Sequence, residues 1–185
     1  MAVPKQRHMT ADEFEQFTAQ SENAERRWEF IDGEVIGVPS NPYSSQIAAL
    51  IIAALMTFVR PRGLGHVTGE GAGYIIAGQK LSPDIAFVSK SRQATIPYNV
   101  HYNPIAPDLM VEVLSPTNKP EDMEKKSKAC AVANVLLWIV NPESRSVKIY
   151  TPGQPITEFG ILGVLKDRDV LPGFKLRVSD IFPIL

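Results

Sequence analysis

Residues 108–114 read Asp-Leu-Met-Val-Glu-Val-Leu, and after a helical pattern from about Pro120 to Ala133 the chain continues with Val135-Leu-Leu-Trp-Ile-Val140. The two flanking segments are apolar at nearly every position, which is typical of central strands buried on both faces of a sheet. The segment between them begins with Glu121 and Asp122, and acidic residues there suit the helix dipole. Strand, helix and strand in this order predict a crossover unit and a partly parallel sheet.

Two patterns extend this unit toward the N-terminus. Apolar residues recur at helical spacing from Ile47 to Phe58, nearly all round the predicted helix, so we expect it to lie deep in the core and to end near Gly63. Earlier, Trp28-Glu-Phe-Ile31 and Glu34-Val-Ile-Gly-Val38 flank Asp32-Gly33. Short apolar runs around Asp-Gly predict a hairpin with a type I′ turn.

The remaining elements are short. Thr10-Ala-Asp-Glu13 is a capping box that predicts a helix start. A polar loop is expected from about Ser89 to Pro107. Further short strands and a final helical turn are expected at 66–68, 74–77, 84–88, 147–150 and 178–182.

Composition narrows the class of protein. The 185 residues, 44% hydrophobic and 21% charged, predict one soluble domain over 9–185 after a flexible segment 1–8. The net charge of −1 gives no basic field for nucleic acid, although acidic metal ligands would cancel a basic groove in this total. A single cysteine, Cys130, excludes an intrachain disulfide.

The sequence also predicts a cytoplasmic protein without a membrane segment. The N-terminus has no apolar leader, and the longest apolar run, Ile47 to Met56, is shorter than the roughly 20 residues that span a bilayer. No P-loop, dinucleotide fingerprint, nucleophile elbow or zinc-protease motif occurs, and the three histidines are scattered.

Acidic residues stand where strands should be apolar. Glu112 lies in the middle of a predicted buried strand, and Asp84 follows Ser82-Pro83 and opens Ile-Ala-Phe-Val88. A buried ionised carboxylate needs a salt bridge, a cage of hydrogen bonds, a raised pKa or a metal. Neighbouring strands can aim both acids at one point, where they repel by about 4 kcal/mol at an effective dielectric of 20. Mg²⁺ or Mn²⁺ would relieve that repulsion, since hard cations take oxygen ligands.

Glu29, in the predicted hairpin, and Lys126, in the helix after the Glu112 strand, are two further candidates. Each of the four residues also has a structural interpretation. Glu29 would be a surface acid at a strand end, and Asp84 a turn-capping acid. Glu112 would be the partner of a buried arginine, and Lys126 a solvated lysine.

Several motifs along the chain are family-specific in combination, above all Ser82-Pro-Asp-Ile-Ala-Phe-Val88 with Pro107-Asp-Leu-Met-Val-Glu-Val-Leu-Ser-Pro116. Others are Met9-Thr-Ala-Asp-Glu-Phe14, Trp28-Glu-Phe-Ile-Asp-Gly-Glu34, Ser40-Asn-Pro-Tyr-Ser-Ser45, Gly63-Leu-Gly-His-Val-Thr-Gly69, Trp138-Ile-Val-Asn-Pro142, Tyr150-Thr-Pro-Gly153 and Val170-Leu-Pro-Gly173. Over about residues 9 to 182 the chain resembles the Uma family of restriction-endonuclease-like proteins, within the PD-(D/E)xK nuclease superfamily.

The resemblance implies an α/β (α+β) fold: a restriction-endonuclease-like mixed sheet flanked by helices, with extra N- and C-terminal β-hairpins. It implies that Asp84 and Glu112 hold Mg²⁺ (or Mn²⁺), with the main-chain carbonyl of Val113 as a further ligand. Glu29 would assist through water. Lys126 would position or activate the attacking water, with Lys125 as the fallback.

The sequence departs from the family pattern at three positions. The superfamily lysine two residues after the glutamate is Leu114 here, and the lysine is expected on the following helix instead. Ser44 and Cys130 stand where many family members have histidine and tyrosine. These last two changes affect accessory contacts and leave the acidic residues unchanged.

Three hypotheses follow. The first is a Mg²⁺-dependent endonuclease that hydrolyses DNA. The second is a nucleic-acid- or protein-binding module that keeps the fold without cleaving. The third is a scaffold in which Glu112 is only a buried ion-pair partner. A homodimer is compatible with the resemblance, which leaves the oligomeric state open.

Overall fold

The computed structural model describes residues 8–23, 26–38, 41–166 and 169–183, so nearly all of the segment expected to be flexible (1–8) lies outside the described residues. Its centre is a six-stranded sheet of order β11-β10-β9-β8-β6-β3. Only β8 and β9 pair in parallel, and the other pairs are antiparallel, so the sheet is mixed as expected. The strands are β3 (Gly65–Thr68), β6 (Ile85–Ser89), β8 (Leu109–Val113), β9 (Leu136–Asn141), β10 (Ser146–Tyr150) and β11 (Thr157–Phe159).

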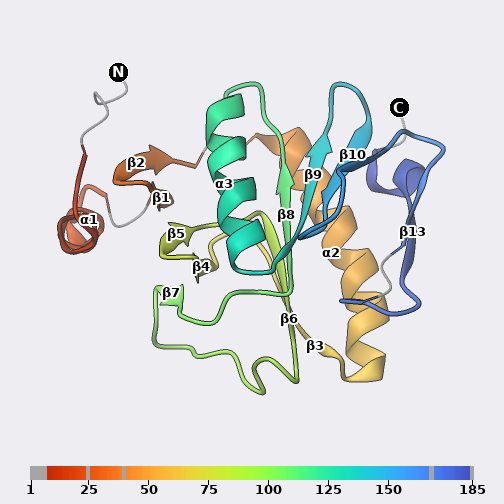
Figure 1. The fold of residues 1–185 in the computed structure, drawn as a ribbon, viewed down its shortest axis with the longest axis horizontal. Helices are drawn as coiled ribbons and strands as arrows, with labels where there is room; N and C mark the ends of the chain where they lie inside the picture. Colours follow the sequence, from red (N-terminus) through yellow and green to blue (C-terminus); the bar gives the residue numbers. More distant parts are fainter. Residues whose placement is uncertain (1–7, 24–25, 39–40, 167–168, 184–185) are drawn as a thin grey trace.

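The predicted crossover unit is confirmed. Helix α3 (Pro120–Val132) connects the parallel strands β8 and β9. Figure 1 shows these strands between α3 on one side and α2 (Pro42–Arg62) on the other. Side chains alternate between the two faces of a strand, so Leu109, Val111 and Val113 of β8 join the core beneath α2. Glu112 therefore projects from the opposite face, toward α3.

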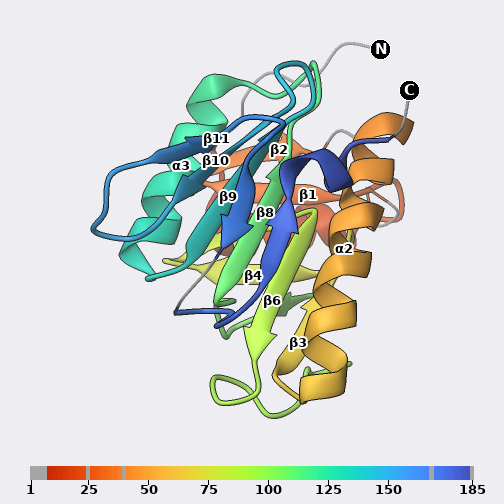
Figure 2. The same cartoon turned by 90° about the vertical axis from the view of Figure 1, so that its right-hand side faces the viewer.

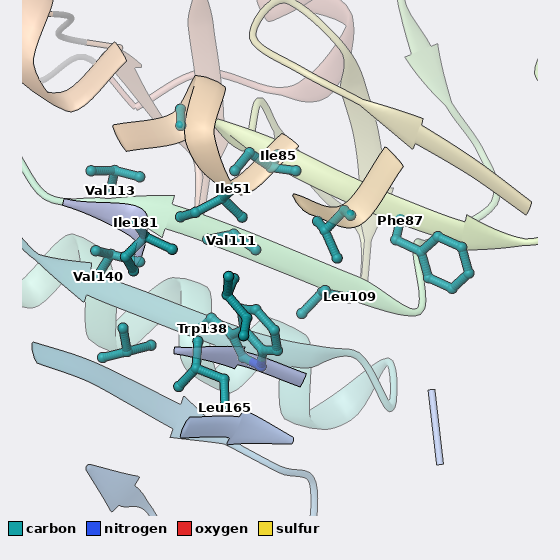
Figure 3. Close-up of a cluster of buried hydrophobic side chains, with 14 of the residues drawn as sticks. Ile51, Ile85, Phe87, Leu109, Val111, Val113, Trp138, Val140, Leu165 and Ile181 are labelled. Carbon is teal, nitrogen blue, oxygen red and sulfur yellow. The ribbon is translucent and has the colours of Figure 1, made fainter. Parts of the chain in front are cut away.

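The core beneath α2 is built from the sheet, α2 and the C-terminal elements. Figure 3 shows Val111 and Trp138 of adjacent strands together with Ile51 of α2 and Ile181 near the C-terminus. The C-terminal part comprises the antiparallel pair β12 (Val164–Lys166) and β13 (Lys175–Arg177) and the short helix η1 (Val178–Ile181). This pair and the hairpin β9–β10 supply the C-terminal strands that the resemblance implies.

Helix α2 is longer and less enclosed than the sequence indicates. Asn41 caps it by accepting a hydrogen bond from the Ser44 N–H at 2.9 Å, and Gly63 ends it in the left-handed conformation. One face, with Ile47, Ile51 and Leu55, is fully buried, while the other face is only half-buried or exposed. Figure 2 shows α2 at the edge of the molecule, beside the strands of the central sheet. By length and composition alone α2 resembles a membrane span, a test that core helices of soluble proteins also pass. Here it packs on the sheet.

A second sheet of order β2-β1-β5-β4-β7 adjoins the first. Its strands are β1 (Trp28–Ile31), β2 (Glu34–Gly37), β4 (Gly73–Ile76), β5 (Gln79–Leu81) and β7 (Tyr102–Asn103). The hairpin β1–β2 forms as predicted, since both Asp32 and Gly33 have the positive φ that a type I′ turn needs. The capping box of Thr10 begins α1 (Ala11–Ala19). The two-residue strand β7 lies within the expected loop and has no sequence signal of its own.

Candidate active site

The candidate site lies where the two sheets meet. Residues 82–84 connect β5 of the second sheet to β6 of the central sheet. Glu29 belongs to β1 of the second sheet, and Glu112 to β8 of the central sheet. Both carboxylates are almost completely buried, with exposed fractions of 2% for Glu29 and 6% for Glu112. The interpretation of Glu29 as a surface acid is therefore wrong.

Lys126 joins these two acids. It lies on α3 with an exposed fraction of 3%, so the interpretation as a solvated lysine is also wrong. Its Nζ is 2.8 Å from Oε2 of Glu29 and 3.1 Å from Oε1 of Glu112. The other oxygen of Glu29, Oε1, accepts a hydrogen bond from the Ser82 N–H at 2.8 Å. The buried partner of Glu112 is thus a lysine, and not the arginine that the structural interpretation supposed.

Asp84 is held against the end of β8. Its Oδ2 accepts a hydrogen bond from the Val113 N–H at 2.8 Å. Strand β6 pairs with β8 so that Ile85 lies opposite Val111, and continuing this register places Pro83 opposite Val113. Proline has no N–H, so residue 83 cannot donate a ladder bond to the Val113 carbonyl. Asp84 therefore replaces one ladder bond, and Pro83 removes the other.

The charges around the site are unbalanced. Burial, together with the charges of Glu29 and Asp84, outweighs Lys126 and raises the pKa of Glu112 to about 8. Burial also raises the pKa of Asp84, against the Val113 N–H and the charges of Lys126 and Arg27. Burial lowers the pKa of Lys126, but the carboxylates of Glu112 and Glu29 outweigh burial and hold it above its usual value. One buried cation thus faces three carboxylates.

Lys125, the fallback lysine, points elsewhere. Its Nζ forms an ion pair with Oε2 of Glu34 at 2.6 Å, at the edge of the second sheet. Adjacent residues on a helix project about 100° apart, so only one of two neighbouring lysines can point into the acid cluster. That lysine is Lys126.

Sequence reasoning missed four residues around the cluster. Arg27 and Glu70 form an ion pair (Nη2–Oε2 3.6 Å), and the charges of both act on Asp84. Tyr102 donates a hydrogen bond to the Trp28 carbonyl at 2.8 Å, and burial raises the pKa of its hydroxyl to about 12. Ser82 supplies the N–H that binds Glu29. Two of the four had a signal in the sequence: Arg27 lies two residues before Glu29, and Ser82 directly precedes Pro83-Asp84.

Ser44 and Cys130, two of the three positions where the sequence departs from the pattern of the family it resembles, have structural roles here. The Ser44 hydroxyl donates to the Leu114 carbonyl at 3.1 Å, which ties the start of α2 to the end of β8. Cys130 is buried beside Met110, with its Sγ 3.8 Å from the methionine sulfur. Burial raises the pKa of the Cys130 thiol to about 12, so it is a packed, unreactive thiol.

The donor set suits a hard divalent cation. In the part of the chain that the structure describes, no group of three or more His, Cys, Asp or Glu side chains is placed to hold a metal ion. The donors that the resemblance implies are the Asp84 and Glu112 carboxylates and the Val113 carbonyl. Continuing the β6–β8 register places that carbonyl opposite Pro83, which offers it no ladder hydrogen bond. These ligands are all oxygens, and two added positive charges would offset the acidic excess.

Comparisons with known proteins agree with this architecture. The model of the Uma2 family, described as "Putative restriction endonuclease", matches residues 11–179. A crystal structure of a "putative nuclease belonging to DUF820" from Anabaena variabilis is similar, with a TM-score of 0.81 and 23% sequence identity. The similarity covers 94% of this chain and 97% of that chain, and it shows the shared fold. A search of curated proteins gives no significant match.

Proposed function

The chain belongs to the Uma2 family, and on that premise we propose that it is a metal-dependent endonuclease that hydrolyses DNA phosphodiester bonds. One observation carries the proposal. Lys126 is buried between Glu29 and Glu112, at the strand end where Asp84 is held on the Val113 N–H. An acidic excess buried at the junction of two sheets is costly for a scaffold, and it is useful for holding a cation.

Mg²⁺ or Mn²⁺ would be held by Asp84 and Glu112, with the Val113 carbonyl as the third protein ligand. When bound, such an ion supplies Lewis-acid stabilisation of phosphate charge and a lowered pKa for its water. Asp84 suits this role because only one of its two oxygens, Oδ2, accepts the hydrogen bond from the Val113 N–H. Glu112 would be drawn to its ionised form as its proton is displaced.

Lys126 would orient the attacking water and stabilise negative charge on the phosphate. Its ammonium is fixed by two carboxylates and remains charged at neutral pH, because Glu112 and Glu29 raise its pKa. Glu29 would act as a positioning residue, since it holds Lys126 through one oxygen and the Ser82 N–H through the other. This arrangement lets the lysine act without rotating.

A second candidate function is a nucleic-acid- or protein-binding module without cleavage. It is favoured by the absence, among the described residues, of a three-residue metal group, and by the involvement of Lys126 in two ion pairs. In that case the ion pairs of Lys126 with Glu29 and Glu112 would only stabilise the fold.

A cleavage assay separates the two functions. Supercoiled plasmid and single-stranded DNA would be incubated with Mg²⁺ or Mn²⁺, with Glu112→Gln purified in parallel. We expect metal-dependent nicking that the Glu112→Gln variant lacks. The absence of cleavage, or equal cleavage by the variant, would overturn the endonuclease and leave the binding module.

A further inference from the structure

A groove of about 460 Å³ runs along the other flank of α3, between this helix and strands β9 and β10. The proposed catalytic groups do not line it. It is lined by residues of the connection between β8 and α3, of α3 itself, of β9 and β10, and of the segment that follows β10. We name it the α3–β10 groove. Its volume lies in the range of natural small-molecule and nucleotide sites.

The α3–β10 groove begins beside the candidate active site. Its residues Leu114 and Ser115 directly follow Val113 along the chain. Ile139, in its floor, is the register partner of Glu112 in the parallel pair β8–β9. Glu112 and Ile139 thus lie on the same face of the sheet, on the neighbouring strands β8 and β9. The groove therefore adjoins the end of β8, where the metal is proposed.

The polar groups that the groove offers are mainly donors. The Asn118 Oδ1 already accepts hydrogen bonds from the Ser115 N–H and hydroxyl. The Asn141 Oδ1 likewise accepts from the backbone N–H groups of Glu143 and Ser144. A ligand would therefore meet the amide nitrogens of both asparagines, which only donate. Phosphate oxygens and base carbonyls are complementary to such a surface.

The charge of the groove is also complementary to nucleic acid. Its one acidic residue, Glu124, forms an ion pair with Lys128 at 2.7 Å. Lys119 and Lys148 are exposed, and neither forms an ion pair within the described residues. Glu158, opposite Lys148 across β10–β11, accepts a hydrogen bond from Ser146 instead. Two cations thus flank a groove whose single acid is neutralised.

Between the lysines the floor is apolar and includes an aromatic ring. Tyr150, Met123 and Ile139 lie there with Leu114 and Ile156. Aromatic and apolar side chains of this kind stack on the faces of nucleobases, which a duplex keeps hidden in its own stack. The surface therefore favours a strand whose bases are unpaired.

We propose that the α3–β10 groove binds unpaired nucleotides of a nucleic-acid strand, next to the position where the backbone is cut. The inference rests on the proposed function and adds to it the substrate class, single-stranded or locally unpaired nucleic acid. Lys119 and Lys148 contact the phosphates, the two asparagines donate to base edges, and Tyr150 stacks on a base.

The test measures binding separately from cleavage. Fluorescence anisotropy with a labelled oligothymidylate of about 12 nucleotides and with a duplex of similar length would be recorded in the non-cleaving Glu112→Gln background. The groove variants are Lys148→Glu and Tyr150→Leu; the leucine keeps apolar packing and loses the planar ring. Lys175→Glu, at an exposed lysine of β13, makes the same charge change on a strand that packs on the opposite face of the central sheet. A mononucleotide competitor distinguishes a nucleotide site from a strand site.

We expect the single strand to bind more tightly than the duplex, and each groove variant to weaken this binding about tenfold while Lys175→Glu does not. The mononucleotide should compete only weakly. Equal binding by the groove variants and Lys175→Glu, preference for the duplex, or full competition by the mononucleotide would each overturn the inference. Plasmid nicking by the wild type tests the endonuclease independently, so either proposal can fail alone.

Discussion

Glu112 is the residue at which the stability of the fold and the proposed chemistry make opposite demands. Its carboxylate is buried beside two other acids, which favours the protonated form, whereas metal binding requires the ionised form. Lys126 compensates only part of this cost, because it is shared with Glu29. The stability of the metal-free protein should therefore depend on the protonation state of Glu112.

The stability of the metal-free protein should fall between about pH 5 and about pH 9. The folded pKa of Glu112, about 8, lies above its ordinary value of 4.5, so its contribution is complete below the unfolded pKa and is lost as pH rises through the folded one. Melting temperatures recorded with a chelator across this range would show the decline. Glu112→Gln should flatten it, and parallel profiles for wild type and variant would contradict the assignment.

Replacing Lys126 with methionine should lower cleavage by roughly 10²–10⁴-fold, the usual effect of losing a group that positions or activates water. It should also destabilise the metal-free protein by about 3–5 kcal/mol at neutral pH, because the buried Glu29 carboxylate loses its cation and Glu112 loses its hydrogen-bond partner. Metal binding, measured by calorimetry, should be retained. Loss of metal binding would show that the role given to Lys126 is wrong.

Lys125→Met is the matched control. The Lys125–Glu34 ion pair is partly exposed, so its loss should change the free energy of unfolding by less than about 1 kcal/mol. Cleavage should be unchanged. If Lys125→Met slowed cleavage as much as Lys126→Met does, the assignment of the catalytic role to Lys126 would be wrong.

At the scale of the elements, the decisive contact is the one between β6 and the end of β8. Asp84 binds the Val113 N–H, and Pro83 leaves the Val113 carbonyl without a ladder donor from the opposite residue. The dipeptide Pro83-Asp84 thus opens the ladder where the metal is proposed. A second Pro-Asp pair, Pro107-Asp108, occurs at the other end of β8, where Asp108 is held by the Ser89 N–H and by Arg92.

Pro83→Ala should weaken metal binding, because the new N–H at position 83 can pair with the Val113 carbonyl. Titration of Mn²⁺ by calorimetry would measure the change, for which we expect about tenfold, a typical loss when the surroundings of a metal ligand are altered. Pro107→Ala changes the other Pro-Asp pair and should leave the affinity unchanged. Equal affinities for Pro83→Ala and wild type would exclude the Val113 carbonyl as a ligand.

At the scale of the whole molecule, a metal that binds only the folded state must stabilise all of it. Mn²⁺ at about 100 times its dissociation constant should add about 2.7 kcal/mol to the free energy of unfolding. Differential scanning calorimetry would detect this as a higher melting temperature for the wild type. Asp84→Asn should remove the shift in melting temperature. An equal shift in both proteins would show that the metal does not bind at Asp84.

Much of the fold followed from local patterns in the sequence. The apolar runs of β8 and β9, the helix between them and the Asp32-Gly33 turn each carry a signal within a few residues. The two-residue strand β7 and the one-sided burial of α2 depend on neighbours distant in sequence, and local patterns do not contain them.

The candidate site residues could likewise be proposed from the sequence, because an acid in an apolar strand is a local anomaly. Glu112 and Asp84 stood out in this way, Glu29 and Lys126 were further candidates from their positions, and the resemblance implied the role of each. Their burial, the sharing of Lys126 by two acids and the ion pair that directs Lys125 to Glu34 came only from the folded chain. Ion pairs depend on distances between side chains on separate elements, and packing alone sets those distances. The sequence by itself therefore determined which residues are unusual, and the tertiary structure decided which of them meet.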